Sequence, residues 1–129
     1  MKVVAYGIQP SEKGILAQAN HKKHDITLIA NALSEKTAFY AQGKQAVIVF
    51  SGLEVSSATL QLLAELGIKY LIHHSKTVSF SGENAKKYGI TWANITLSSY
   101  MVGVPHDALL QATEQTIFLL DEWHALETN

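Results

Sequence analysis

Serine, histidine and glutamate side chains gather at two places in this sequence, and these residue types could form a nucleophilic triad. Ser51 and Glu54 follow one short apolar run, and His73, His74 and Ser75 lie at the end of another. A triad needs a serine on a sharp turn between a strand and a helix, within a pattern such as G-x-S-x-G. No such pattern surrounds either serine, so we expect no catalytic residue in this chain.

The adjacent histidines are also candidate metal ligands, together with Glu54 and His106. Zinc sites need three or four ligands that converge on one point. Because His73 and His74 are neighbours at the end of a strand, their side chains point to opposite sides. We therefore expect no metal site, with one of the two histidines half-buried and the other exposed.

Three further groups of residues are expected to be structural. His21 and His24 flank two lysines in a turn, where we expect a solvated surface. Trp92 and Trp123 are expected in the core or at an interface. The pair Lys86 and Lys87 is expected on the exposed face of a helix.

The composition restricts the partners and the place of action. The formal net charge of -1 gives no general attraction to nucleic acid or membrane, and no apolar run approaches the length of a spanning helix. Cysteine is absent and no secretory signal is recognisable, so we expect a cytoplasmic protein. All ten basic residues are lysines, so these 129 residues contain no arginine to clamp a carboxylate in two places.

Familiar cofactor and phosphate motifs are missing as well. The eight glycines never take the G-x-G-x-x-G spacing of a dinucleotide site, so we expect no cofactor. A flavodoxin needs a phosphate loop rich in hydroxyl groups, and the segment 7–11, in which only Ser11 carries one, is poorly suited to that role. The acidic residues of a response-regulator receiver are also missing after the apolar runs 2–6 and 46–50.

Apolar runs alternate with amphipathic stretches along the whole chain. This alternation predicts one α/β domain over residues 1–129, a doubly wound parallel sheet of five strands in the order 2-1-3-4-5. We predict that Ser11 caps a first helix and that Ser56 or Ser57 caps a third, which stops at Gly67. Strands are predicted over 2–8, 25–30, 46–50, 69–73 and 91–95, and helices over 11–20, 34–41, 56–66, 83–88 and 105–125.

The predicted order of strands also gives a core and a binding crevice. Ligands of open parallel sheets bind beyond the carboxyl ends of the strands, where the strand order reverses. We expect almost complete burial of Val3, Val4, Val47, Ile48, Val49 and Leu71. We expect any ligand to contact Gly7, Ile8, Gln9, Ser51, Gly52, Ser75, Lys76 and Thr77.

Several segments, in this order and spacing, resemble the N-terminal substrate domain of the D-2-hydroxyacid dehydrogenase family, which includes D-lactate dehydrogenases. These segments are KVVAYGIQPSEKGILAQAN (2–20), AVIVF (46–50), LLAELGIKYLI (62–72) with Ser75 soon after, AKKYGITWANI (85–95) and ATEQTIFLL (112–120). The resemblance implies a flavodoxin-like fold and a ligand that is a small anion, such as a 2-oxo or 2-hydroxy acid.

The resemblance does not extend to the family's catalytic groups. In that family a following domain binds NAD and supplies the substrate arginine and a glutamate–histidine pair. Where the family has arginine-serine, a small residue and glycine, this chain has His74, Ser75, Lys76 and Thr77. The resemblance therefore implies only the position of a substrate loop, in which Lys76 either holds an anion or simply lies in solvent.

Three functions remain open from the sequence. The first is a stand-alone substrate-type domain, not competent for catalysis, that binds a small molecule or a protein. The second is a part of an NAD-dependent D-2-hydroxyacid dehydrogenase whose cofactor domain is another chain, or an unrelated activity in the same crevice. The third is a domain that serves only assembly.

The last predicted helix carries an unusually wide apolar arc. Leu109, Ala112, Thr116, Leu120 and Trp123 recur at helical spacing, and further apolar residues widen the arc at Leu110, Ile117 and Leu119. We expect this helix to fold back on its own sheet and its remaining apolar edge to meet a twofold mate in a homodimer. A helix swapped onto the neighbouring subunit is the alternative.

Overall fold

Strands and helices alternate along the part of the chain that the structure, a computed structural model, describes, namely residues 1–50, 55–75, 81–96 and 106–128. The five strands form one parallel sheet in the order β2-β1-β3-β4-β5, which confirms the predicted α/β fold class and topology. The strands are β1 (Lys2–Tyr6), β2 (Asp25–Ile29), β3 (Ala46–Val49), β4 (Tyr70–Ser75) and β5 (Thr91–Thr96). The helices are α1 (Pro10–Asn20), the short 3-10 helix η1 (Ala38–Ala41), α2 (Ser57–Glu65), α3 (Ser81–Lys87) and α4 (His106–Thr128).

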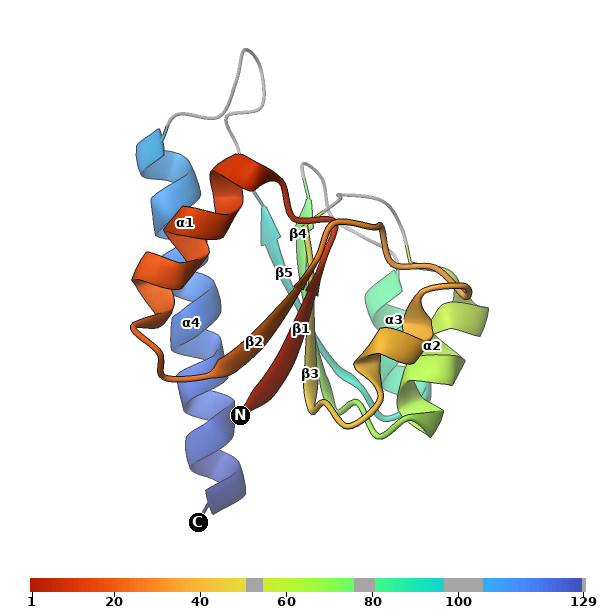
Figure 1. Cartoon of the computed structure of the whole chain (residues 1–129). Helices are drawn as coiled ribbons and strands as arrows, with labels where there is room; N and C mark the ends of the chain where they lie inside the picture. The colour runs from red at the N-terminus through yellow and green to blue at the C-terminus, as the bar shows by residue number, and fades with distance from the viewer. Residues whose placement is uncertain (51–54, 76–80, 97–105, 129) are drawn as a thin grey trace.

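Helices cover both faces of the sheet (Figure 1). Helices α1 and α4 lie side by side on one face, and α2, α3 and η1 lie on the other. Each face therefore has its own apolar cluster, and the central strand β3 contributes alternate residues to both. The core prediction is confirmed, because the six residues predicted from the sequence are all at most 1% exposed, namely Val3, Val4, Val47, Ile48, Val49 and Leu71.

The starts of two helices show how local chemistry fixes a boundary. Ser56 caps α2 as predicted, since its Oγ accepts a hydrogen bond from the backbone N–H of Thr59 at 3.1 Å. The predicted cap at Ser11 is wrong, because α1 begins earlier, with Gln9 as N-cap and Pro10 in the first turn. The backbone N–H of Gln9 donates to Oε1 of Glu12 at 2.8 Å, and proline favours the first helical position.

The predicted helix over 34–41 is wrong for its first half. Only Ala38–Ala41 is helical, and it is a 3-10 turn. The Thr37 hydroxyl donates to the carbonyl oxygen of Ala32 at 2.8 Å and accepts from the backbone N–H of Ser34 at 2.9 Å. These side-chain bonds satisfy the backbone groups that a helix would otherwise use, so they favour a turn.

Helix α4 folds back on its own sheet, as expected. Ala112, Ile117, Leu120 and Trp123 are buried in the same apolar cluster as β1 and β3, and the indole of Trp123 stacks on Tyr70 with ring centroids 4.7 Å apart. Within the described ranges no helix, α4 included, combines the length and the apolar character needed to cross a membrane.

Candidate functional site

The connection between β1 and α1 borders the predicted crevice at the carboxyl edge of the sheet. Gly7 has a φ of +69°, a conformation that suits glycine, and its backbone N–H donates to the carbonyl oxygen of Asn31 at 2.8 Å. Ile8 is buried, and its N–H donates to the carbonyl oxygen of Ile29 at 3.3 Å. Gln9 is exposed. The connection is therefore tied to the end of β2, and Gln9 is the residue of the three that reaches solvent.

The structure describes only some of the residues that are predicted to contact a ligand. Gly7, Ile8 and Gln9 lie at the carboxyl end of β1, and Ser75 is the last residue of β4, paired with Thr96. Parallel strands bring these positions to the same edge of the sheet. The other residues predicted to contact a ligand lie outside the described residues, namely Ser51, Gly52, Lys76 and Thr77. Glu54, the candidate side chain for binding a metal ion, also lies outside them.

His73 and His74 point to opposite faces of the sheet, as predicted, but the expected difference in exposure is wrong. Both side chains are buried, at 0% and 1% exposed. His73 lies on the α2–α3 face, where its Nδ1 is 3.1 Å from Oδ1 of Asn94 and its ring centroid is 5.2 Å from that of Trp92. The register of β4 against β5, which places His73 opposite Asn94, makes this pair possible.

His74 lies on the opposite face, among residues of β3 and α4. Its ring packs on Phe50 with centroids 4.6 Å apart, and its Nε2 is 2.8 Å from Oγ1 of Thr116. The Thr116 hydroxyl donates its proton to the carbonyl oxygen of Ala112 at 2.9 Å. Thr116 therefore accepts from His74, and the imidazole proton sits on Nε2.

Burial keeps the His74 imidazole neutral. Loss of solvation lowers the pKa of His74 to about 4, and the neighbouring His73 contributes in the same direction. Nδ1 of His74 is buried and has no hydrogen-bond partner among the described residues. A buried acceptor of this kind is uncommon in folded proteins, and here it lies on the strand that leads to the candidate crevice.

The described residues contain no group of three histidine, aspartate or glutamate side chains placed to hold a metal ion. His73 and His74 cannot hold one ion together, because the sheet divides them between its two faces. Of the residues that the structure describes, this edge therefore presents buried imidazoles and the exposed Gln9.

The expected solvated surface at His21 and His24 is wrong for His24. The His24 side chain is only 2% exposed, and its Nε2 lies 2.8 Å from Oδ1 of Asp121 on α4. Asn20 holds the backbone of the turn, because its side-chain amide donates to the His24 carbonyl and accepts from the His24 N–H. The sequence of residues 20–25 could not indicate this contact, because Asp121, the partner of His24, lies 97 residues away along the chain.

Comparison with known proteins gives similar sequences among enzymes that act on 2-hydroxy and 2-oxo acids. The chain is 28% identical over 114 residues to D-lactate dehydrogenase of Lactobacillus delbrueckii subsp. bulgaricus, a match that covers 86% of this chain and 34% of that protein. It is 26% identical over 112 residues to an aromatic 2-oxoacid reductase of Clostridium sporogenes, again over 34% of that protein. The chain thus spans about a third of the length of the curated relatives it matches.

Solved structures give the same result. The apo-structure of D-lactate dehydrogenase from Escherichia coli superposes with a TM-score of 0.65 at 27% identity, over 74% of this chain and 31% of that chain. The Salmonella D-lactate dehydrogenase superposes equally well, at 27% identity over 74% of this chain and 30% of that one. No protein-family model matches the chain.

Proposed function

We propose that this chain, which is homologous to about a third of the D-lactate and D-2-hydroxyacid dehydrogenases, is a binding domain for a small 2-oxo or 2-hydroxy acid. The ligand would lie at the carboxyl edge of the sheet, in contact with Gly7, Ile8 and Gln9 and with the segments that contain Gly52 and Lys76.

The observation that carries this proposal is the homology together with the retained sheet order. The chain keeps the topology in which the strand order reverses between β1 and β3, and open α/β sheets bind ligands outside the carboxyl ends at that point. Gly7, with its positive φ, lets the backbone turn away at the end of β1. The relatives act on 2-oxo or 2-hydroxy acids by name, and this supports the choice of ligand.

We propose binding rather than hydride transfer because these 129 residues lack the groups for it. They contain no arginine and no G-x-G-x-x-G pattern. The described histidines at the carboxyl edge, His73 and His74, are both buried, and Nε2 of His74 is held by Thr116. A general acid or base must come within hydrogen-bond reach of the substrate, which a fully buried imidazole does not do without a change in structure.

The test is a titration of the chain with pyruvate, D-lactate and a larger aromatic 2-oxo acid, followed by NMR of the backbone amides. We expect saturable shifts at Gly7, Ile8 and Gln9 with at least one of these acids. Lys76→Gln should weaken that binding, whereas Lys87→Gln, a change on the exposed end of α3, should leave it unchanged. Absence of shifts at the carboxyl edge with all three acids would remove the support for this function.

A second candidate is that the chain forms one part of an NAD-dependent dehydrogenase whose cofactor domain is supplied by another chain. The favouring observation is that the similar enzymes are about three times as long as the matched region. Activity after addition of a protein with a dinucleotide motif separates the candidates. The fragment oxidises NADH with a 2-oxo acid only when that partner is present, whereas the binding domain stays inactive with it, and neither candidate predicts NADH binding by this chain alone. Micromolar NADH binding to this chain alone would contradict both.

A further inference from the structure

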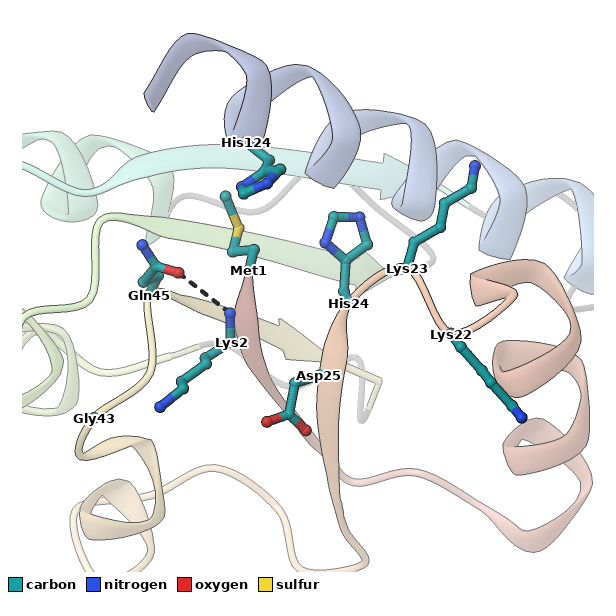
Figure 2. A pocket seen from close by; sticks show the side chains of 9 residues that line it. All are labelled: Met1, Lys2, Lys22, Lys23, His24, Asp25, Gly43, Gln45 and His124. Atoms are coloured by element: carbon teal, nitrogen blue, oxygen red, sulfur yellow. Dashed lines mark hydrogen bonds between the residues drawn. The ribbon is translucent and has the colours of Figure 1, made fainter. Parts of the chain in front are cut away.

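A pocket lies at the edge of the sheet where the strands begin, opposite the predicted crevice at the carboxyl edge. It is a pocket of about 620 Å³ between the starts of β1 and β2, the turn after α1 and the last turns of α4 (Figure 2). This volume falls within the range of small-molecule sites. The ionisable side chains that line it are those of Lys2, Lys22, Lys23, His24, Asp25 and His124.

The charge of this pocket contrasts with that of the whole chain. Three lysines against two carboxylates, those of Asp25 and of Asp121, which pairs with Lys23, leave an excess of one positive charge with the histidines neutral, in a protein whose formal net charge is -1. In Figure 2 Lys2 and Lys22 extend on either side of Asp25, and their side chains point away from each other. Among the described residues neither Lys2 nor Lys22 has an ion-pair partner, whereas Lys23 pairs with Asp121 at 3.4 Å.

His24 gives the pocket a fixed polar group. Burial works against the charged form of Asp121, but hydrogen bonds from His24 and Lys23 lower its pKa below the usual value, so its carboxylate is ionised at neutral pH. That carboxylate holds Nε2 of His24. Nδ1 of His24 is buried and lacks a hydrogen-bond partner within the described part of the chain. Figure 2 shows the His24 ring standing between Met1 and α4, with the His124 ring beside it at a centroid distance of 6.1 Å.

The turn that carries Lys22 and His24 is held in an uncommon conformation. His21 and Lys22 are the two described non-glycine residues with positive φ, at +48° and +61°, and the N–H of Lys23 closes the turn on the carbonyl oxygen of Asn20 at 2.9 Å. Such conformations cost free energy for residues with a side chain and persist only where the surroundings fix them. The turn therefore presents Lys22 and His24 at one defined place.

We propose that this pocket binds a small phosphorylated compound with free hydroxyl groups. The flexible side chains of Lys2 and Lys22 would turn toward a phosphate monoester, which is close to a dianion at neutral pH, and supply positive charge to it. Lysine is a suitable point charge for phosphate in a chain without arginine. Asp25 accepts hydrogen bonds from hydroxyl groups of the ligand. Nδ1 of His24, which has no hydrogen-bond partner among the described residues, accepts from a hydroxyl of the ligand once the side chains that cover it move aside.

The experiment uses ribose 5-phosphate as the probe, with ribose and inorganic phosphate as separate arms. Backbone amide shifts locate the site, and calorimetry gives the dissociation constant. We expect saturable shifts at residues 22–25 and at His124 with ribose 5-phosphate, smaller ones with phosphate and none with ribose. Lys2→Gln and Lys22→Gln should each weaken binding about tenfold, the effect of losing one charged contact. Lys36→Gln, an exposed lysine outside this pocket, is the matched control and should leave binding unchanged.

Three results would overturn the proposal. The first is no saturable binding of ribose 5-phosphate at millimolar concentrations. The second is shifts confined to Gly7, Ile8 and Gln9, which would assign the phosphate to the carboxyl edge. The third is equal weakening by Lys36→Gln, which would show a general charge effect. The site stands apart from the proposed 2-oxo acid crevice, so either can fail while the other holds.

Discussion

The hydroxyl of Thr116 links a buried histidine to the backbone of the helix that covers it. It accepts from Nε2 of His74 and donates to the carbonyl oxygen of Ala112. Without that hydroxyl, the His74 N–H would be a buried donor with no acceptor. Unsatisfied buried groups cost more than a hydrogen bond gains, so Thr116 stabilises chiefly by preventing this loss.

We expect Thr116→Val to lower the free energy of unfolding by about 1–3 kcal/mol, because it keeps the side-chain shape and removes the acceptor. Thr116→Ser keeps the hydroxyl and should cost clearly less. Urea titrations of both variants check this. A larger loss for serine than for valine would show that the methyl group, and not the hydrogen bond, is responsible.

The lowered pKa of His74 makes stability depend on pH in a defined window. The unfolded chain takes up this proton near pH 6.5, and the folded chain only near pH 4, so the unfolded state binds more protons in between. The free energy of unfolding should therefore fall as the pH decreases from about 6.5 to 4, by roughly 3 kcal/mol in total for this group.

The measurement is a set of urea titrations from pH 7 to pH 4.5 on the natural chain and on His74→Gln. The glutamine amide can still donate to Thr116 but has no proton to gain. Carboxylates such as Asp121 and Glu127, whose pKa values are lowered, titrate in both proteins, so the difference between the two pH profiles isolates His74. Parallel profiles would contradict the assignment.

Single residues also show where the sequence was a poor guide. The opposite orientation of His73 and His74 follows from strand geometry and was predictable. Their burial was not, because it depends on partners such as Asn94 and Thr116 that only the sheet register and helix packing bring close. The burial of His24 likewise requires Asp121 from the far end of the chain.

Among the elements, β3 has the clearest sequence signal, since its apolar, β-branched run is typical of a central parallel strand. The prediction held, and every residue of β3 is buried. Boundaries were less predictable, because they depend on a few hydrogen bonds. Helix α1 starts earlier than predicted, because Gln9 bonds to Glu12 and Pro10 favours the first turn. The hydrogen bonds of Thr37 favour a turn in the first half of the predicted helix 34–41.

Val49→Ala tests the central position of β3. We expect a loss of roughly 1–3 kcal/mol in the free energy of unfolding, since the lost methyl groups leave a gap between buried neighbours. Leu28→Ala on the edge strand β2, where the side chain is 39% exposed, is the control and should cost less despite removing more atoms. A loss under about 0.5 kcal/mol for Val49→Ala would contradict a central β3.

For the whole molecule, the homodimer remains a prediction. Folding back buries part of the apolar arc of α4 within the chain, including Trp123. Of the arc residues, Leu110 and Leu119 stay partly exposed, and two apolar residues of α4 outside the arc are more exposed, Phe118 at 62% and Leu126 at 70%. We expect a second copy to cover these apolar side chains.

Light scattering at micromolar concentration should give about twice the chain mass of 14.1 kDa. Phe118→Lys should shift the mass toward that of the monomer. Phe39→Lys, at an exposed ring on η1, should leave it unchanged. A natural chain that stays monomeric at these concentrations would contradict the homodimer.

The position of α4 beside α1 also has a consequence for the order in which the domain folds. The β1–β3 pair and helix α1 come from the first 50 residues, yet the apolar face that they share is completed by residues 112–123. Contacts this distant in sequence form slowly, because a long loop must close first. We therefore expect that face to stay partly uncovered during synthesis until helix α4 has left the ribosome, and the nascent chain to be most prone to aggregation in this interval.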